Sequence, residues 1–188
     1  MWKKGVEVQH LTEYMGVYYP SGFTSDNAGN NIVVPPSHMV MRTIALNDQV
    51  AYPWFAPAGT RRGGVTNATA AGYISNEGEF VSVALNEGQR DTLYQSNVNP
   101  ITFLNGAGLV VFGQKTRARN ASSLDRVNVA RLVIYLRSQL KQLAKPYIFE
   151  PNDKITRDEL KQQVESLLVE LVGLRALYDY LVVCDETN

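Results

Sequence analysis

The sequence of 188 residues is poor in the side chains that most often bind metals or form covalent links. It has one cysteine, Cys184, and two histidines, His10 and His38. A single cysteine excludes an internal disulfide, and these three side chains fall short of the usual four ligands of a structural zinc site. The sequence therefore predicts no metal and no other cofactor, and a reducing cytosol is the default compartment.

Long apolar runs are also missing. No window reaches the roughly 18 apolar residues that a membrane-spanning helix needs. Two lysines lie near the start of the chain, but no apolar run follows them, so these residues do not form a signal peptide. With 45% apolar and 19% charged residues, the chain is expected to be globular, and we expect no membrane binding by this chain itself.

The formal net charge is zero, with 18 basic and 18 acidic side chains, which argues against a nucleic-acid coat. The charges are unevenly distributed: residues 1–114 have a net charge of −2, residues 115–145 of +7 and residues 150–186 of −5. Within the basic segment, Arg137, Lys141 and Lys145 recur every fourth residue, which places them on one face of a predicted helix. This face is either simply solvated or a candidate protein-contact surface.

The first half of the chain alternates short β-prone runs with helical signals. We predict strands near residues 15–19 and 32–34, and a helix over 38–48 that Ser37 caps and whose apolar side includes Met39, Val40, Ile44 and Val50. Prolines and glycines in residues 51–64 argue against regular structure. Residues 65–85 read as mostly loop with a possible strand at 80–85, and Asn86 caps a short helix through Tyr94.

The second half contains the clearest periodic patterns. Asn99-Pro100 predicts a turn, and residues 101–104 and 109–112 predict a tight hairpin. A helix opens near Ser122 or Ser123 and runs to about Lys145. A capping box from Thr156 to Glu159 opens the next helix, and residues 178–184 predict a final strand. We expect an α/β fold of mixed α+β type, with a mixed β-sheet packed against two long helices and shorter helices.

One loop weakly resembles a phosphate-binding loop. A phosphate-binding loop ends with a glycine followed directly by a lysine and then a serine or threonine. The segment Gly106–Thr116 ends with Gly113, Lys115 and Thr116, but an additional Gln114 separates the glycine from the lysine. Strand-forming residues also occupy the stretch that would have to curl around a phosphate. A small anion- or nucleotide-binding enzyme using the Gly106–Thr116 loop stays open as the alternative function.

Other candidates for chemistry have plain structural explanations, and we predict no catalytic, cofactor-binding or metal-binding residue. The carboxylates near residues 150–159 suit a turn and a helix start better than acid–base chemistry or a cation. Cys184 is expected to be buried and inert. The aromatic residues of the YPWF string are expected to pin their loop to the domain. The carboxylates are Glu150, Asp153, Asp158 and Glu159, and the aromatic residues are Tyr52, Trp54 and Phe55.

Five segments, taken in order, resemble the core of contractile tail sheath proteins of phages and related injection machines. The similar strings are VVPPS with PWFAPAG, VNPITFLNGAGLVVFGQKT, SSLDRVNVARLVIYLRSQL, YIFEPND and VVCDETN. Any one string is a weak signal, whereas five in the family's order over residues 14–188 are specific.

The resemblance implies a structural protein and not an enzyme. Sheath subunits polymerise as hexameric rings around a tail tube and contract to drive the tube through the host envelope. The implied partners are other sheath subunits, linked by arms that add strands to a neighbour's sheet, together with the tail tube protein and the baseplate and tail terminator proteins. The implied location is the virion tail sheath, and the host cytoplasm during assembly.

The sequence also departs from the family. Residues 1–13 match no known segment, and family members carry a variable outer region before the core and a linking arm after the last string. We therefore expect residues 14–188 to be a tail sheath core domain without the outer region and the C-terminal arm, present here as a fragment or a divided subunit. Without the arms, the isolated chain is expected to be mainly monomeric.

Overall fold

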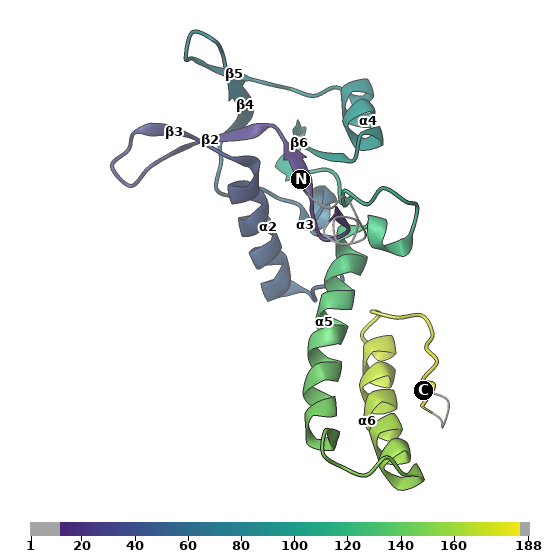
Figure 1. The fold of residues 1–188 in the computed structure, drawn as a ribbon. Helices are drawn as coiled ribbons and strands as arrows, with labels where there is room; N and C mark the ends of the chain where they lie inside the picture. The colour runs from purple at the N-terminus through teal and green to yellow at the C-terminus, as the bar shows by residue number, and fades with distance from the viewer. Residues whose placement is uncertain (1–11, 185–188) are drawn as a thin grey trace, which may run out of the picture. The chain divides into compact units, whose positions relative to one another are not determined.

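The computed structural model describes residues 12–184, and these fall into two compact units that meet in the sequence at Ala130 and Arg131 (Figure 1). Most of the unmatched segment 1–13 and the last four residues of the VVCDETN string therefore lie outside the described residues. All strands of the described residues belong to the first unit. Among the residues described, no helix has the length and apolar character needed to cross a bilayer.

The first sheet has three strands in the order β1-β6-β7: β1 (Val17–Tyr19), β6 (Val98–Leu104) and β7 (Gly108–Val111). β1 runs parallel to β6, and β6 pairs with β7 in the predicted hairpin, whose turn uses positive φ angles at Gly106 and Gly108. The predicted turn at Asn99-Pro100 is wrong, because both residues lie inside β6. Pro100 lacks an N–H but its carbonyl still accepts a hydrogen bond from the Phe112 amide at 2.8 Å.

The second sheet is antiparallel, in the order β3-β2-β4-β5. Its strands are β2 (Ser21–Ser25), β3 (Asn31–Val34), β4 (Ala70–Ile74) and β5 (Phe80–Ser82). β4 lies in a segment that the sequence predicted as loop, because alanine and glycine at its start have low strand propensity. Gly72 is required there, since a Cβ atom would overlap the carbonyl oxygen of Val81 on β5.

Three helices complete the first unit: α2 (Pro36–Val50), α3 (Gly59–Arg62) and α4 (Glu87–Gln95). α2 begins before the predicted Ser37 cap, at a proline whose fixed φ suits the first helical position. Val50, predicted on its apolar side, is 81% exposed. α3 is a single turn inside the segment predicted to be irregular. The predicted α4 is confirmed, with Asn86 and Gln89 forming a reciprocal capping box.

The core of the first unit joins both sheets to α2. Met39 of α2 and Ile101 of β6 are completely buried, and Val111 of β7 is nearly so. The full cluster consists of apolar side chains from α2, β3, β4, β6 and β7 and from the segment before β4: Val34, Met39, Val40, Val65, Ala71, Ile101, Leu109 and Val111. A single cluster of this kind holds the two sheets as one body.

The two long helices are α5 (Val127–Ala144) and α6 (Lys154–Gly173), and the boundary between the units lies within α5. A short 3-10 turn, Ser123–Asp125, with Ser122 as its cap, precedes α5. α6 starts before the predicted capping box, since the Asp153 carboxylate accepts the amide of Thr156 at 2.9 Å. The helices and the mixed pairing of strands confirm the mixed α+β class.

The predicted strand over residues 178–184 is wrong: these residues have no strand partner assigned to them. Tyr178 is 100% exposed and Leu181 is 86% exposed. The segment has the β-branched and aromatic composition of a strand, but composition does not supply the edge with which a strand must pair.

Candidate interaction surfaces

The Gly106–Thr116 loop does not form a phosphate cradle, because its backbone amides already donate to groups of the protein. A phosphate loop needs several amides that converge on free space. Here four amides of residues 111–116 donate to the sheet, to its neighbours and to a buried asparagine: Val111 donates to Gly63, Phe112 to Pro100, Lys115 to Asn99 and Thr116 to Asp125.

The side chains of this loop are also engaged within the protein. The Lys115 ammonium donates to the Tyr94 carbonyl at 3.0 Å and lies 4.2 Å from the centre of the Tyr94 ring. The Thr116 hydroxyl, in a residue only 2% exposed, donates to the Leu124 carbonyl at 2.7 Å. The lysine and threonine that suggested nucleotide binding therefore tie the chain after β7 to its surroundings.

Asn99 is the centre of this arrangement, and its role was not visible in the sequence. It is fully buried, and its amide nitrogen donates to the carbonyls of Val17, at 3.1 Å, and Lys115, at 2.8 Å. Its oxygen accepts the Lys115 amide at 2.6 Å. Gly113 leaves room for this side chain, since a Cβ there would lie 2.8 Å from the Asn99 oxygen. One side chain thus joins β6, β1 and the segment after β7.

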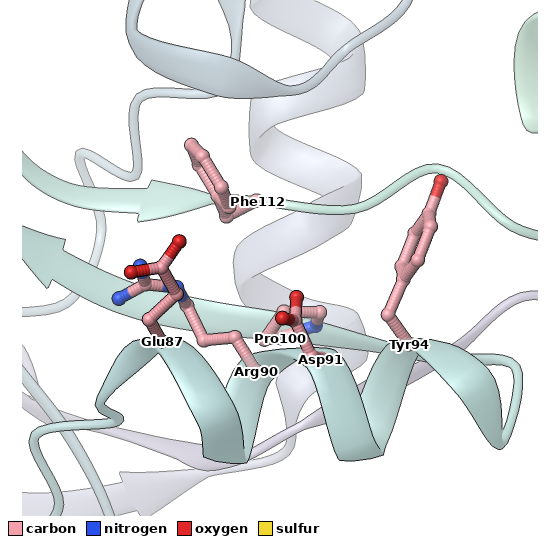
Figure 2. Close-up of a pocket in the computed structure, with 6 residues that line it drawn as sticks. All are labelled: Glu87, Arg90, Asp91, Tyr94, Pro100 and Phe112. Atoms are coloured by element: carbon pink, nitrogen blue, oxygen red, sulfur yellow. The ribbon is translucent and has the colours of Figure 1, made fainter.

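A pocket of about 320 Å³ opens beside α4, and we call it the α4 pocket (Figure 2). Pro100 of β6 and Phe112, directly after β7, supply its apolar surface. Its other lining residues all come from α4: Glu87, Arg90, Asp91 and Tyr94. Their spacing of three and four residues places them along one helix face, which was the available sequence signal. The sequence did not predict the pocket, because the apolar part comes from another element.

The pocket combines an apolar surface with a charged rim. Phe112 is 42% exposed, and the Arg90 guanidinium lies 5.4 Å from the centre of its ring. The Arg90 guanidinium also donates a hydrogen bond to the Leu85 carbonyl at 3.0 Å, which fixes its position. Glu87 and Asp91 are exposed on the helix. Such a surface suits an apolar side chain flanked by charges.

The three residues predicted to contact another protein lie on α5 and on the turn that follows it. Arg137 and Lys141 lie one helical turn apart on α5, and Lys145 begins the 3-10 turn that follows the helix. All three side chains are exposed. The structure thus places the predicted basic face at the surface of the second unit.

Of the four carboxylates that the sequence grouped near residues 150–159, Asp153 forms the N-terminal cap of α6. The amide of Thr156 donates to the Asp153 carboxylate, and this hydrogen bond holds the pKa of Asp153 below its ordinary value of 3.8. Within residues 12–184, no cluster of three or more histidine, cysteine, aspartate or glutamate side chains could hold a metal ion. The Asp153 carboxylate is a helix cap.

The aromatic residues of the YPWF string pin their loop, as predicted. Tyr52 stacks on Trp54 with ring centres 4.7 Å apart, and Trp54 is 6% exposed. Arg62 lies over the Phe55 ring at 4.9 Å, and Asn47 donates to the Phe55 carbonyl. Cys184 is half-buried rather than fully buried.

Sequence comparison finds known proteins to which parts of this chain are similar. Residues 119–188 match the phage tail sheath C-terminal domain family. The chain is 37% identical over 155 residues to the tail sheath protein of Vibrio phage KVP40 and 33% identical over 155 residues to that of Enterobacteria phage T4. Each alignment covers 82% of this chain but only 22% of the relative. The chain is therefore similar in sequence to tail sheath proteins and spans about a fifth of the length of these relatives.

Solved structures agree on the fold. The sheath complex of an extracellular contractile injection system in its contracted state has a TM-score of 0.72 at 21% identity, and the match covers 94% of this chain and 46% of that one. The contracted helical sheath of the anti-feeding prophage has a TM-score of 0.66 at 25% identity, over 84% of this chain and 40% of that one. The expected resemblance to sheath proteins is confirmed.

Proposed function

We propose that residues 14–188 form the core of a contractile tail sheath subunit, which polymerises as hexameric rings around a tail tube and contracts to drive the tube through the host envelope. The role is structural and not enzymatic. The observation that carries the proposal is the coincidence of two independent likenesses: sequence identity above 30% to phage tail sheath proteins, and a fold shared with contracted sheaths over nearly the whole chain.

The core is one part of a longer machine. The relatives are several times longer than this chain, so the proposed core would be one part of a subunit that also has an outer variable region and a C-terminal arm. The segment 178–184 supports a role for strand exchange. Its exposed Tyr178 and Leu181 and its β-prone composition fit a segment that pairs with a strand supplied by an arm.

The proposed partners follow from this role. They are other sheath subunits, the tail tube protein, and the baseplate and tail terminator proteins. The protein is located in the tail sheath of the virion, after assembly in the host cytoplasm. A structure of the anti-feeding prophage baseplate also contains a chain with this fold, with a TM-score of 0.66, which supports an association between sheath and baseplate.

A chimaera tests the proposal. Residues 14–188 would replace the matching segment in the sheath protein of Vibrio phage KVP40, whose arms and outer region would then be supplied by the relative. We expect tubular sheaths by electron microscopy. A chimaera in which Ile101→Asp places a charge at a completely buried position of the core serves as the negative control. A folded, soluble chimaera that never forms tubes or rings would contradict the proposed function.

We further propose that Arg137, Lys141 and Lys145 contact an acidic surface on the tube or on a neighbouring subunit. Their exposure on one face, within a segment of net charge +7, supports this contact. Changing all three to glutamate in the chimaera should abolish assembly at low salt, whereas assembly of the unchanged chimaera should weaken as salt rises.

The matched control reverses the same number of charges at exposed, scattered positions, with Arg42, Arg61 and Arg119 changed to glutamate. This control should assemble, because its charges do not form the basic face. If the first triple variant assembles as well as the control at every salt concentration, the basic face has no role in assembly.

A further inference from the structure

The connection between α5 and α6, together with the first turn of α6, exposes three large apolar side chains. Phe149 is 97% exposed, Ile155 is 70% exposed and Ile148 is 66% exposed. We call these three residues the apolar tip. They lie within eight residues of one another, at the end of two long helices, and an exposed apolar group of this kind indicates a surface that meets another protein.

The α4 pocket offers a complementary surface. Its volume of about 320 Å³ is at the small end of the range for sites that hold a whole ligand, and it suits a protruding side chain. Figure 2 shows the Arg90 side chain reaching from α4 toward the Phe112 ring, with Pro100 on the strand behind the helix. Arg90 already lies over the Phe112 ring, which is still 42% exposed, so an incoming aromatic ring would pack against the part of the Phe112 ring that Arg90 leaves uncovered.

The charges around the two surfaces also correspond. Glu150 directly follows Phe149 in the tip and would approach Arg90 of the pocket. Lys145, four residues before Phe149, would approach Glu87 and Asp91, which are exposed on the rim. The docked ring would therefore have pairs of opposite charges around it, which favours this contact.

We propose that the apolar tip of one copy docks into the α4 pocket of a second copy, with Phe149 seated against Phe112. This inference rests on the proposed sheath function, in which the neighbours of each chain are copies of itself, as in the helical sheath of similar fold. Tip and pocket are different surfaces, so they can join copies head to tail, with each copy engaging one neighbour through its tip and another through its pocket.

Cross-linking tests the contact without altering Phe149 or Phe112. In a Cys184→Ser background, Asn152→Cys places a thiol beside the tip and Glu87→Cys places one on the pocket rim. A short bis-maleimide should link a chain carrying only the first change to a chain carrying only the second. A chain carrying both changes should give a ladder of dimers, trimers and larger products, which is the mark of a head-to-tail contact.

Two controls make the result specific. Adding Phe149→Asp to the doubly changed chain should reduce the ladder at least tenfold. Moving the second thiol from residue 87 to the exposed Met41 on α2 should give no ladder. A ladder that survives Phe149→Asp, or no ladder even at the highest concentration at which the chain stays soluble, would overturn the inference.

The same cross-linking in chimaeric sheaths separates this inference from the proposed function. Tubes without the cross-link would show that the chain assembles through other surfaces, so the docking is wrong while the sheath role stands. A ladder in solution from a chimaera that forms no tubes would establish the docking and contradict the sheath role.

Discussion

Replacing Asn99 by alanine should cost this fold a large part of its stability. The change removes three hydrogen bonds, to the carbonyls of Val17 and Lys115 and to the amide of Lys115, in a position with no access to solvent. Each such bond contributes a net of about 1 kcal/mol, and each buried group left without a partner costs about 1–3 kcal/mol. Water entering the space would recover part of the loss, so we expect a fall of roughly 3–5 kcal/mol in the free energy of unfolding.

The measurement is urea-induced unfolding at neutral pH, followed by circular dichroism. The matched control is Asn27→Ala, at an exposed turn position, where a surface change is expected to stay within about 0.5 kcal/mol. Asn99→Asp is a second probe: it keeps the acceptor for the Lys115 amide but directs a carboxylate oxygen at two carbonyls. Its stability relative to the unchanged chain should improve as the pH is lowered and the carboxyl is protonated.

A small loss of stability in Asn99→Ala would refute this reasoning. If Asn99→Ala lies within about 1 kcal/mol of the control, the three hydrogen bonds contribute no more than one ordinary bond. The segment after β7 would then be held by its other contacts, such as those of Lys115 and Thr116.

Two further predictions concern local structure. Gly72→Ala should destabilise the chain by about 1–3 kcal/mol in the same unfolding assay, because the new Cβ meets backbone on β5 that cannot rotate away. Gly173→Ala, where no atom lies within 4 Å of the added Cβ, should be neutral or stabilising by at most about 1 kcal/mol, and equal losses at both sites would refute the packing argument. The lowered pKa of Asp153 predicts a stabilisation of α6 that is complete above the ordinary value of 3.8 and is lost as the pH falls through the lower value of the folded state. Asp153→Asn caps the helix without titrating, so it should retain more helix by circular dichroism in acid than the unchanged chain, and coincident acid titrations would rule this role out.

What the sequence predicted correctly was determined locally. The α4 helix was predicted because Asn86 is a favoured capping residue, and the hairpin because Gly106 and Gly108 provide the left-handed angles that its turn requires. The exposure of Arg137, Lys141 and Lys145 agrees with their spacing of four residues, and their contact with another protein stays a prediction. Each of these features depends on neighbours within a few positions in the sequence.

What the sequence did not predict depends on distant partners. β4 is a strand only because β2 and β5 pair with it, although its own residues have little strand propensity. The sequence around Asn99 predicts a turn, because the residues that show its actual role are distant in the sequence. These are Val17 and Lys115, whose carbonyls accept hydrogen bonds from the Asn99 side chain. Residues 178–184 have the opposite property, because their composition favours a strand but no partner edge is assigned within the described chain. The α4 pocket likewise needs Phe112 beside a helix that ends far earlier in the sequence.

Because the apolar tip and the α4 pocket are different surfaces, the proposed contact bears on how long an assembly of copies can become. A contact between two identical patches ends once two copies have met, whereas a knob and a socket on different parts of one chain leave an unused socket after every addition. An assembly of copies joined head to tail in this way can therefore grow without a defined end. Its number of copies would have to be limited by another component, and a rigid tube of fixed length would set that limit.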